Sequence, residues 1–330
     1  MVDYTTFPKI ELHLHLDCSL SYDVVKAIRP DISLEEYRSH YLFPSKCTDL
    51  ADYLHRAYSG VRLMQSAKNI RLVILDLFQQ LKSDNVIYAE LRFAPLQHLE
   101  QDLDSETVVE TARNAIREGS ELTGVKASLI LCTLRHFSKA QSMETVKLVK
   151  KHMDDIIVGF DIAADEAGHP IDNHIKAFDF ANRENIPCTA HAGEAKGPES
   201  VWETLDHFHP SRIGHGVRSI EDPRLIQYLK DKNIHLEVCP VSNVIINIVD
   251  KIENHPIDSL FKQDVSLSIN TDARALMNND LASEYAILSK VFNWSKEDFL
   301  KCNLEAINHA FTDNETKDKL RQRIISAYRN

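Results

Sequence analysis

Three histidines and one aspartate are spaced so that they could share one metal ion. His13 and His15 alternate with leucines in the segment 9–16, while His191 and Asp272 lie at the ends of two other short apolar segments. Side chains of a strand alternate between its two faces, so His13 and His15 are expected to point the same way. Two imidazoles held close together resist double protonation and suit a metal ion.

Three histidines and one aspartate form a nitrogen-rich set of ligands. Such a set favours Zn²⁺ over Mg²⁺ or Ca²⁺, which prefer oxygen ligands, although iron, manganese or cobalt could bind it too. A single His-x-His motif is weak evidence, because a lone histidine after a strand is more often a hydrogen-bonded structural residue. The joint pattern of His13, His15, His191 and Asp272 predicts a metal site that activates a water molecule for hydrolysis.

Short apolar segments alternate with longer helical patterns along the chain. The segments predicted to be strands span 9–16, 86–93, 126–133, 156–163, 186–193, 212–216, 234–240 and 265–270. Patterns typical of helices span 61–83, 105–122 (with a cap-like entry at Ser105), 142–153, 174–185 and 222–233, and the chain after Asn270 is mostly helical.

Repeated strand–helix pairs predict an α/β fold, a (β/α)8 TIM-type barrel with additional helices. An open doubly wound sheet is the alternative, but it usually has a glycine-rich first turn. The sequence has only 9 glycines and no such turn. In a barrel the C-terminal strand ends meet at one mouth, so His13, His15, His191 and Asp272 would converge there with Glu194 and His215.

The composition indicates an ordinary soluble protein. The 330 residues fit one barrel domain, residues 1–330, and the net charge of −11 disfavours nucleic acids and anionic membranes as partners. The 6 cysteines form no CxxC pair, which favours free buried thiols in a reducing cytoplasm. No signal peptide or membrane span is apparent, so we expect a cytoplasmic location. The sequence does not indicate an oligomeric state.

Several motifs resemble those of the adenosine deaminase family of the amidohydrolase superfamily. They occur in the family's order over nearly the whole chain: PKIELHLHLD (8–17), YAELRFAP (88–95), GFDIAADE (159–166), TAHAGE (189–194), RIGHG (212–216), LEVCPVSN (236–243) and SINTDA (268–273). The resemblance implies a barrel that replaces the 6-amino group of a purine nucleoside with oxygen and releases ammonia. It is not the zinc deaminase class that uses H-x-E with P-C-x-x-C.

The resemblance also implies roles for individual residues. The zinc ligands would be His13, His15, His191 and Asp272, with one Zn²⁺ per chain. Glu194 matches the proton donor to the purine ring, which must be protonated when substrate is bound, and burial would raise its pKa in that direction. His215 matches the residue that orients the attacking water and supports its charge. Asp272 would also accept a proton from that water.

Further matches concern substrate binding. Asp17 resembles the contact to the ribose 5′-hydroxyl, although an aspartate here could instead cap a helix. Ala164 stands where the family usually has a glycine whose N–H binds a purine nitrogen, and alanine keeps that N–H. Leu50 and Leu54, in the segment 49–54, resemble a hydrophobic lid but could be ordinary core leucines. His15 would face the substrate as well as the metal.

Two departures put the substrate in doubt more than the reaction. Ala273 replaces a second aspartate that bonds purine N7 in many members, so that bond is absent or supplied by water or Arg274. Cys18 replaces a usual glycine. The expected substrates are adenosine and 2′-deoxyadenosine, and the alternative is 6-amino-6-deoxyfutalosine or a modified adenine. Other superfamily hydrolyses would not need Glu194, and a non-enzymatic nucleoside-binding barrel would be expected to have lost a metal ligand.

Overall fold

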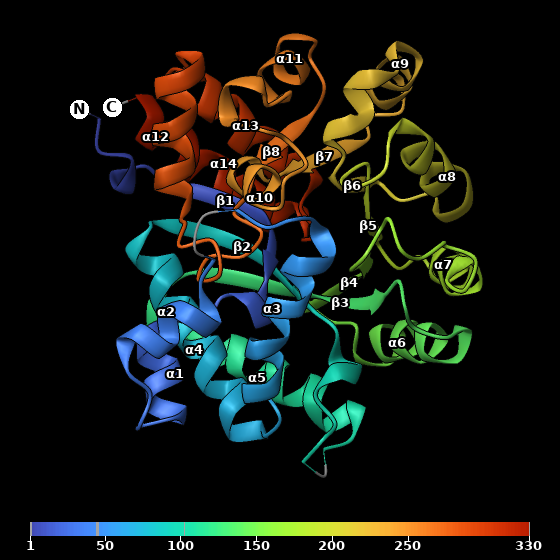
Figure 1. Cartoon of the computed structure of the whole chain (residues 1–330). Coiled ribbons are helices and arrows are strands. Elements are labelled where there is room, and N and C mark those ends of the chain that lie inside the picture. The colour runs from blue at the N-terminus through green and yellow to red at the C-terminus, as the bar shows by residue number, and fades with distance from the viewer. Residues whose placement is uncertain (1, 44–45, 102, 330) are drawn as a thin grey trace.

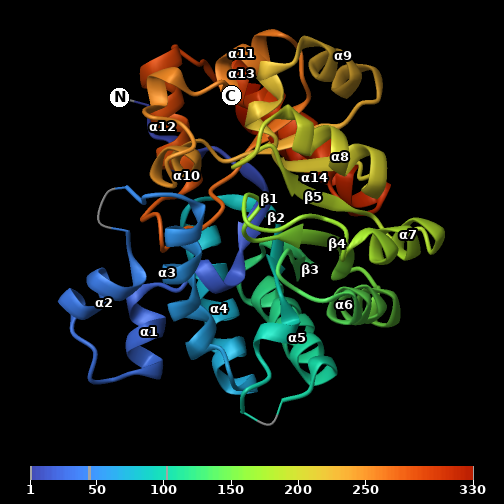
Figure 2. The same ribbon diagram turned by 45° about the vertical axis from the view of Figure 1, so that its right-hand side comes forward.

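The computed structural model describes residues 2–43, 46–101 and 103–329. Its eight strands lie inside a ring of helices (Figures 1 and 2). The strands are β1 (Lys9–His15), β2 (Val86–Phe93), β3 (Lys126–Leu134), β4 (Ile157–Ala163), β5 (Thr189–Ala192), β6 (Arg212–His215), β7 (His235–Val238) and β8 (Leu267–Ile269). Seven of them fall within the segments predicted from the sequence, and β3 extends one residue beyond its predicted segment, to Leu134.

The helices follow the strands or precede them as additional elements. Those in the first half are α1 (Tyr22–Ile28), α2 (Leu34–Tyr41), α3 (Leu50–Leu63), α4 (Ala67–Ser83), α5 (Ser105–Thr123) and α6 (Lys139–His152). Those in the second half are α7 (Ile175–Arg183), α8 (Pro198–Phe208), α9 (Pro223–Asp231), α10 (Pro240–Ile245), α11 (Ile257–Lys262), α12 (Leu281–Phe292), α13 (Lys296–His309) and α14 (Asn314–Arg329). None of the helices in these ranges has an apolar stretch long enough to cross a bilayer.

The strands form a closed parallel barrel. Strands β1–β4 pair in chain order, and so do β5–β8. Between β4 and β5 the sheet continues through the Phe160 N–H, which donates to Pro187 O at 3.0 Å. Between β8 and β1 it closes where His15 N–H donates to Asp272 O at 2.7 Å and Asp272 N–H to His13 O at 3.1 Å. The TIM-type fold is thereby confirmed, and the hydrogen bonds between β8 and β1 join three predicted metal ligands.

One predicted helix is in fact two. The apolar pattern over 61–83 continues through a break between α3 and α4, because side chains there compete with the helical main chain. Ser66 Oγ accepts from Asn69 N at 3.2 Å, and Asn69 Nδ2 donates to Leu63 O at 2.8 Å. Periodicity alone does not detect such a break, since apolar residues recur three or four positions apart in both helices.

Other helix starts also differ from the prediction. The cap of α5 is Asp104, whose carboxylate accepts from Thr107 N, and not Ser105. Helix α6 begins at Lys139, before the predicted residue 142, because Ser138 and Gln141 form a capping box. Helices α1, α2 and α8 were not predicted from the sequence.

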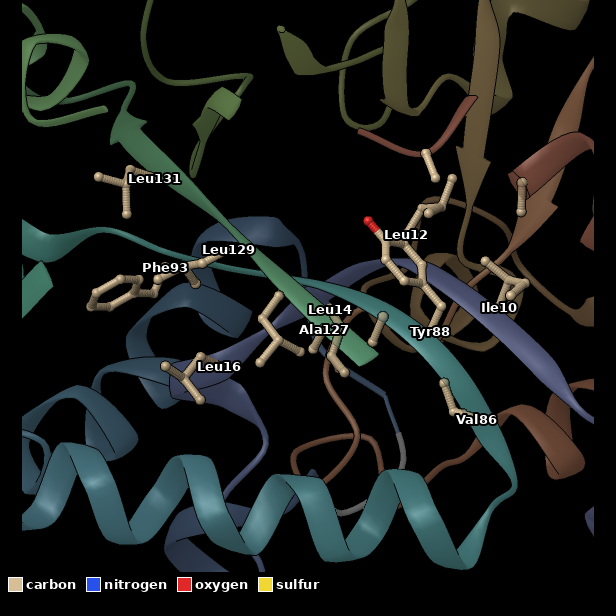
Figure 3. Close-up of a cluster of buried hydrophobic side chains, with 14 of the residues drawn as sticks. Ile10, Leu12, Leu14, Leu16, Val86, Tyr88, Phe93, Ala127, Leu129 and Leu131 are labelled. Atoms are coloured by element: carbon tan, nitrogen blue, oxygen red, sulfur yellow. The ribbon is translucent and has the colours of Figure 1, made fainter. Parts of the chain in front are cut away.

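The apolar core lies between the strands and the helices. A single buried cluster extends from Ile10 in β1 to Tyr328 in α14. Figure 3 draws part of it, including Leu12 and Leu14 of β1 and Leu129 of β3. Leucines therefore face the core on one side of β1, while the alternate residues His13 and His15 face the barrel interior, as strand geometry predicts.

Candidate active site

The four predicted metal ligands meet at the C-terminal mouth of the barrel. His15 Nε2 lies 3.1 Å from His191 Nε2 and 3.4 Å from Asp272 Oδ1. His13 Nε2 lies 3.5 Å from the same Asp272 Oδ1. Residues separated by up to 259 positions in the chain are thus within bonding reach of one point.

Buried carboxylates orient two of these histidines. His13 Nδ1 donates to Glu237 at 2.8 Å, and His191 Nδ1 donates to Asp161 at 3.1 Å. Although burial opposes ionisation, Arg92 and Arg212 hold the pKa of Glu237 well below its usual range. Because ionised carboxylates only accept, each Nδ1 carries a proton and each Nε2 presents its lone pair to the site.

The donor set fits a divalent metal ion. His13 Nε2 is fully buried and makes no hydrogen bond to any residue that the structure describes. A buried lone pair left unbonded is costly, whereas three convergent imidazoles and a carboxylate are typical zinc ligands. Cys239 also lies near His13 and His215, and burial raises the pKa of its thiol well above the usual value.

Two site residues adopt left-handed backbone conformations. His215 has a φ of 59° and Asp272 a φ of 65°, although neither is glycine. Such conformations persist where surrounding bonds enforce them and are frequent at functional sites. The seam between β8 and β1 enforces that of Asp272, and Gly216 N, which donates to Ala192 O at 3.0 Å, holds the end of β6 beside β5.

Glu194 is held at the site by its own loop. Glu166, fully buried, accepts the N–H groups of Gly193 at 2.7 Å and Glu194 at 3.0 Å, and also binds Ser200 Oγ. Gly193 has a φ of 65°, and a Cβ there would lie 2.4 Å from Val201, so only glycine fits this turn. The motif TAHAGE therefore fixes the position of the carboxyl group that follows it.

The electrostatic environment of Glu194 favours its protonated form. Burial, followed by the charges of Asp272 and Glu166, raises its pKa well above the usual value. Its Oε1 lies 3.3 Å from His215 Nε2, and both residues line the same cavity. A buried neutral carboxyl group can donate a proton at neutral pH.

Helix α10 contacts both Asp272 and His215. Ser242 Oγ donates to Asp272 Oδ2 at 2.7 Å, which leaves Oδ1 facing the histidines. Asn243 Nδ2 lies 3.1 Å from His215 Nδ1. The α10 main chain is in turn held by Glu284 of α12, whose Oε1 accepts from Val241 N at 3.1 Å.

The buried carboxyl group of Glu284 predicts how the stability of the protein depends on pH. Burial raises its pKa from 4.5 to about 8, and its Oε2 has no hydrogen-bond partner among the described residues. At pH values between these two pKa values, Glu284 is protonated in the folded state and ionised in the unfolded state. The folded state then binds more protons, so the free energy of unfolding falls as pH rises from about 5 to 8. Glu284→Gln should flatten this slope in urea unfolding of the two proteins. Parallel slopes for variant and parent would contradict the assignment.

A cavity of about 260 Å³ opens in front of these residues. Ligand pockets usually measure about 300–1,000 Å³, so this one suits a compact ligand. Its wall is mostly apolar, and one side is α3, which contributes residues at helical spacing. The residues discussed in the sequence analysis that line it are His15, Asp17, Cys18, Leu50, Leu54, Ala164, His191, Glu194, His215 and Asp272.

The chain has relatives of known activity over its whole length. A family model described as adenosine deaminase matches residues 8–327. An adenosine deaminase of Clostridium acetobutylicum is 34% identical over 324 residues, covering 96% of this chain and 97% of the relative. This chain belongs to the adenosine deaminase family. As a member of that family it is a hydrolase that acts on a C–N bond.

Solved structures agree with this fold. An adenine deaminase from Arthrobacter aurescens superposes with a TM-score of 0.90 at 27% identity, covering 98% of this chain and 99% of that one. An amidohydrolase from Burkholderia ambifaria, solved with bound Zn, also has a TM-score of 0.90, at 21% identity, covering 99% and 92% of the two chains. Because its sequence identity is only 21%, the Burkholderia structure supports the fold alone.

The two departures from the family pattern lie together. Ala273 is fully buried in an apolar cluster that also contains Cys18, Leu50 and Tyr53, and it is not among the cavity residues. Cys18 does line the cavity. The position at which many members of the adenosine deaminase family carry a second aspartate is therefore part of a buried apolar cluster here and does not line the cavity.

Arg274 does not reach the cavity. Its guanidinium binds Glu11 at 2.7 Å and Asp84 at 2.8 Å, and it is buried below the site. The suggestion that Arg274 replaces the missing aspartate is therefore wrong, because both carboxylates occupy its donors. Ala164 lines the cavity with a φ of 79°, so this alanine adopts a left-handed conformation that favours glycine.

Several supporting residues were not identified from the sequence. Glu237, Asp161 and Glu166 orient the histidines and the Glu194 loop, while Ser242 and Asn243 contact Asp272 and His215. A signal existed for the first two, because each is a charged residue within an otherwise apolar strand. In a barrel, such a residue at an inward position needs a buried partner.

Proposed function

We propose that this protein catalyses the zinc-dependent hydrolytic deamination of adenosine and 2′-deoxyadenosine. The convergence of His13, His15, His191 and Asp272 beside Glu194 carries the proposal. The Clostridium relative is an adenosine deaminase, and the Burkholderia neighbour binds Zn. In the reaction, a C–O bond forms at purine C6, the C6–N bond breaks, and inosine or deoxyinosine leaves with ammonia.

The side chains divide the proton transfers between them. When bound, the metal would lower the pKa of a water molecule to about 7 and so supply the nucleophile at neutral pH. Although burial opposes ionisation, the neighbouring histidines His13, His15 and His215 hold the pKa of Asp272 well below its usual range. Asp272 is thus an ionised acceptor for the proton of the attacking water.

Glu194 acts on the other reactant. Its protonated carboxyl donates to the purine ring nitrogen beside C6, which makes that carbon more electrophilic. His215 lies between Glu194 and the metal ligands and orients the attacking water. The apolar cavity and α3 exclude bulk water, which strengthens these interactions.

The cavity favours a nucleoside over a nucleotide. Among the described residues that line it, none is lysine or arginine, while Asp17 contributes a carboxyl group. Burial raises the pKa of Asp17 to about 6, so above that pH it is mostly ionised. A carboxylate suits a ribose hydroxyl and repels a phosphate, since like charges placed together in an interface cost several kcal/mol.

A substrate panel tests this proposal. At pH 8 we expect kcat/KM to be highest for adenosine and 2′-deoxyadenosine, and at least about 100-fold lower for AMP. The panel should include adenine, N6-methyladenosine and 6-amino-6-deoxyfutalosine. Asp17→Asn should lower turnover of adenosine and narrow its advantage over AMP. Faster turnover of AMP, adenine, N6-methyladenosine or 6-amino-6-deoxyfutalosine than of adenosine and 2′-deoxyadenosine would overturn the proposal.

A further inference from the structure

His215 lies at one end of a buried hydrogen-bond chain that leads away from the cavity. Its Nδ1 lies 3.1 Å from Asn243 Nδ2 in α10, and Asn243 Oδ1 lies 3.2 Å from His255 Nε2. Ile257 N, the first residue of α11, donates to His255 Nδ1 at 3.1 Å. Asn243 is fully buried, and His215 and His255 are 1% and 3% exposed.

The main-chain N–H of Ile257 sets the direction of every bond in this chain. A backbone N–H can only donate, so His255 Nδ1 must accept and the proton of the neutral ring resides on Nε2. That proton is donated to Asn243 Oδ1, which turns the amide NH2 toward His215. His215 Nδ1 must then accept, and its proton resides on Nε2, which faces Glu194.

We infer that His255 and Asn243 are positioning residues that hold His215 in its Nε2–H tautomer. The ring then presents a hydrogen-bond donor, not a lone pair, to the cavity. His215 can therefore orient and stabilise an oxygen that carries negative charge, and it cannot act as the base that removes a proton. This hydrogen-bond relay runs from His255 through Asn243 to His215. Its role in catalysis rests on the proposed function, but the tautomer of His215 does not.

Main-chain hydrogen bonds fix the positions of Asn243 and His255 in this hydrogen-bond relay. Asn243 is fixed by its main chain, since its N–H donates to Cys239 O at 3.0 Å and its carbonyl accepts from Ile248 N and Val249 N. His255 N donates to Ile252 O at 3.0 Å. Burial lowers the pKa of His255 to about 3, so the ring stays neutral over the working pH range.

Nitrogen NMR of the zinc-loaded enzyme tests the inference directly. With ¹⁵N-labelled histidine, the His215 signals are those that vanish in His215→Asn. In the parent protein we expect Nδ1 to have the shift of an unprotonated nitrogen and Nε2 that of an N–H. The reverse assignment would overturn the inference by itself, whether or not any variant folds.

Variants of the relay should move these signals. Asn243→Asp places a carboxylate opposite His215 Nδ1, so that nitrogen should gain a proton. His255→Phe should leave the Asn243 amide free to turn and give a mixture of tautomers, while His255→Gln, which keeps a donor, should restore the parent state in part. Unchanged His215 shifts in both Asn243→Asp and His255→Phe would contradict the relay.

A matched control separates the relay from general destabilisation. His235 is another fully buried histidine, bonded to Ser266 Oγ and Ser268 Oγ at 2.9 Å each. His235→Phe should leave the His215 shifts unchanged. For adenosine, Asn243→Asp should lower kcat by about 10-fold or more with a smaller change in KM, as expected for a misprotonated catalytic histidine. If the parent protein deaminated no adenosine, the proposed function would fail while the spectra still decided the relay.

Discussion

Replacing Glu194 with glutamine should reduce deamination of adenosine by more than about 100-fold, the range for loss of a general acid, and leave the metal content unchanged. Glutamine keeps the size of the side chain, but its amide does not transfer a proton to the purine ring. A 100-fold loss corresponds to about 2.7 kcal/mol of transition-state stabilisation. The measurement is kcat and KM on protein whose zinc content has been determined.

A nearby glutamate supplies the control for this variant. Glu199 is exposed in the first turn of α8, five residues beyond Glu194, and it does not line the cavity. Glu199→Gln should therefore retain parental turnover. Near-parental activity of Glu194→Gln, or an equal loss in both variants, would show that Glu194 is not the proton donor.

The second large effect is expected for a metal ligand. His13→Ala should lower zinc affinity by more than about 100-fold, beyond the 10- to 100-fold typical of losing a residue that only orients a ligand. The reason is that His13 supplies a buried nitrogen with no other partner among the described residues. Metal analysis of the purified variant and competition with a chromophoric chelator measure the change.

A histidine outside the site is the matched control for His13. His235 belongs with Glu305 and His309 to a separate group that could hold an ion. Its two ring nitrogens already bind serine hydroxyls, so His235→Ala should keep one zinc ion per chain. If His235→Ala lost zinc while His13→Ala retained it, the metal would be bound near His235 and not at the candidate active site. This result would contradict the proposed function.

The fold and the convergence of the four candidate metal ligands could be predicted from the sequence because they depend on regular geometry. Alternation along β1 places His13 and His15 on one face, and the convergence of parallel strands brings His191 and Asp272 to them. These rules hold regardless of the side chains elsewhere. The helix boundaries were less accessible, because local bonds such as Ser66–Asn69 decide them.

The supporting network could not be predicted in the same way. The contact between Asn243 and His215 depends on how α10 is oriented after β7, and the contact between Asn243 and His255 joins α10 to the turn just before α11. Their side chains follow no period in the sequence. The burial of Arg274 against Glu11 and Asp84 likewise depends on packing beneath the site, which is why a substrate role was wrongly suggested for it.

The location of the metal is the most direct test of the whole account. Crystals of the zinc-loaded protein should show one anomalous peak at the zinc edge, bounded by His13, His15, His191 and Asp272, with Glu194 on the facing wall of the cavity. A fully active crystal form whose only zinc peak lay elsewhere, or that contained no metal at all, would contradict the proposed chemistry.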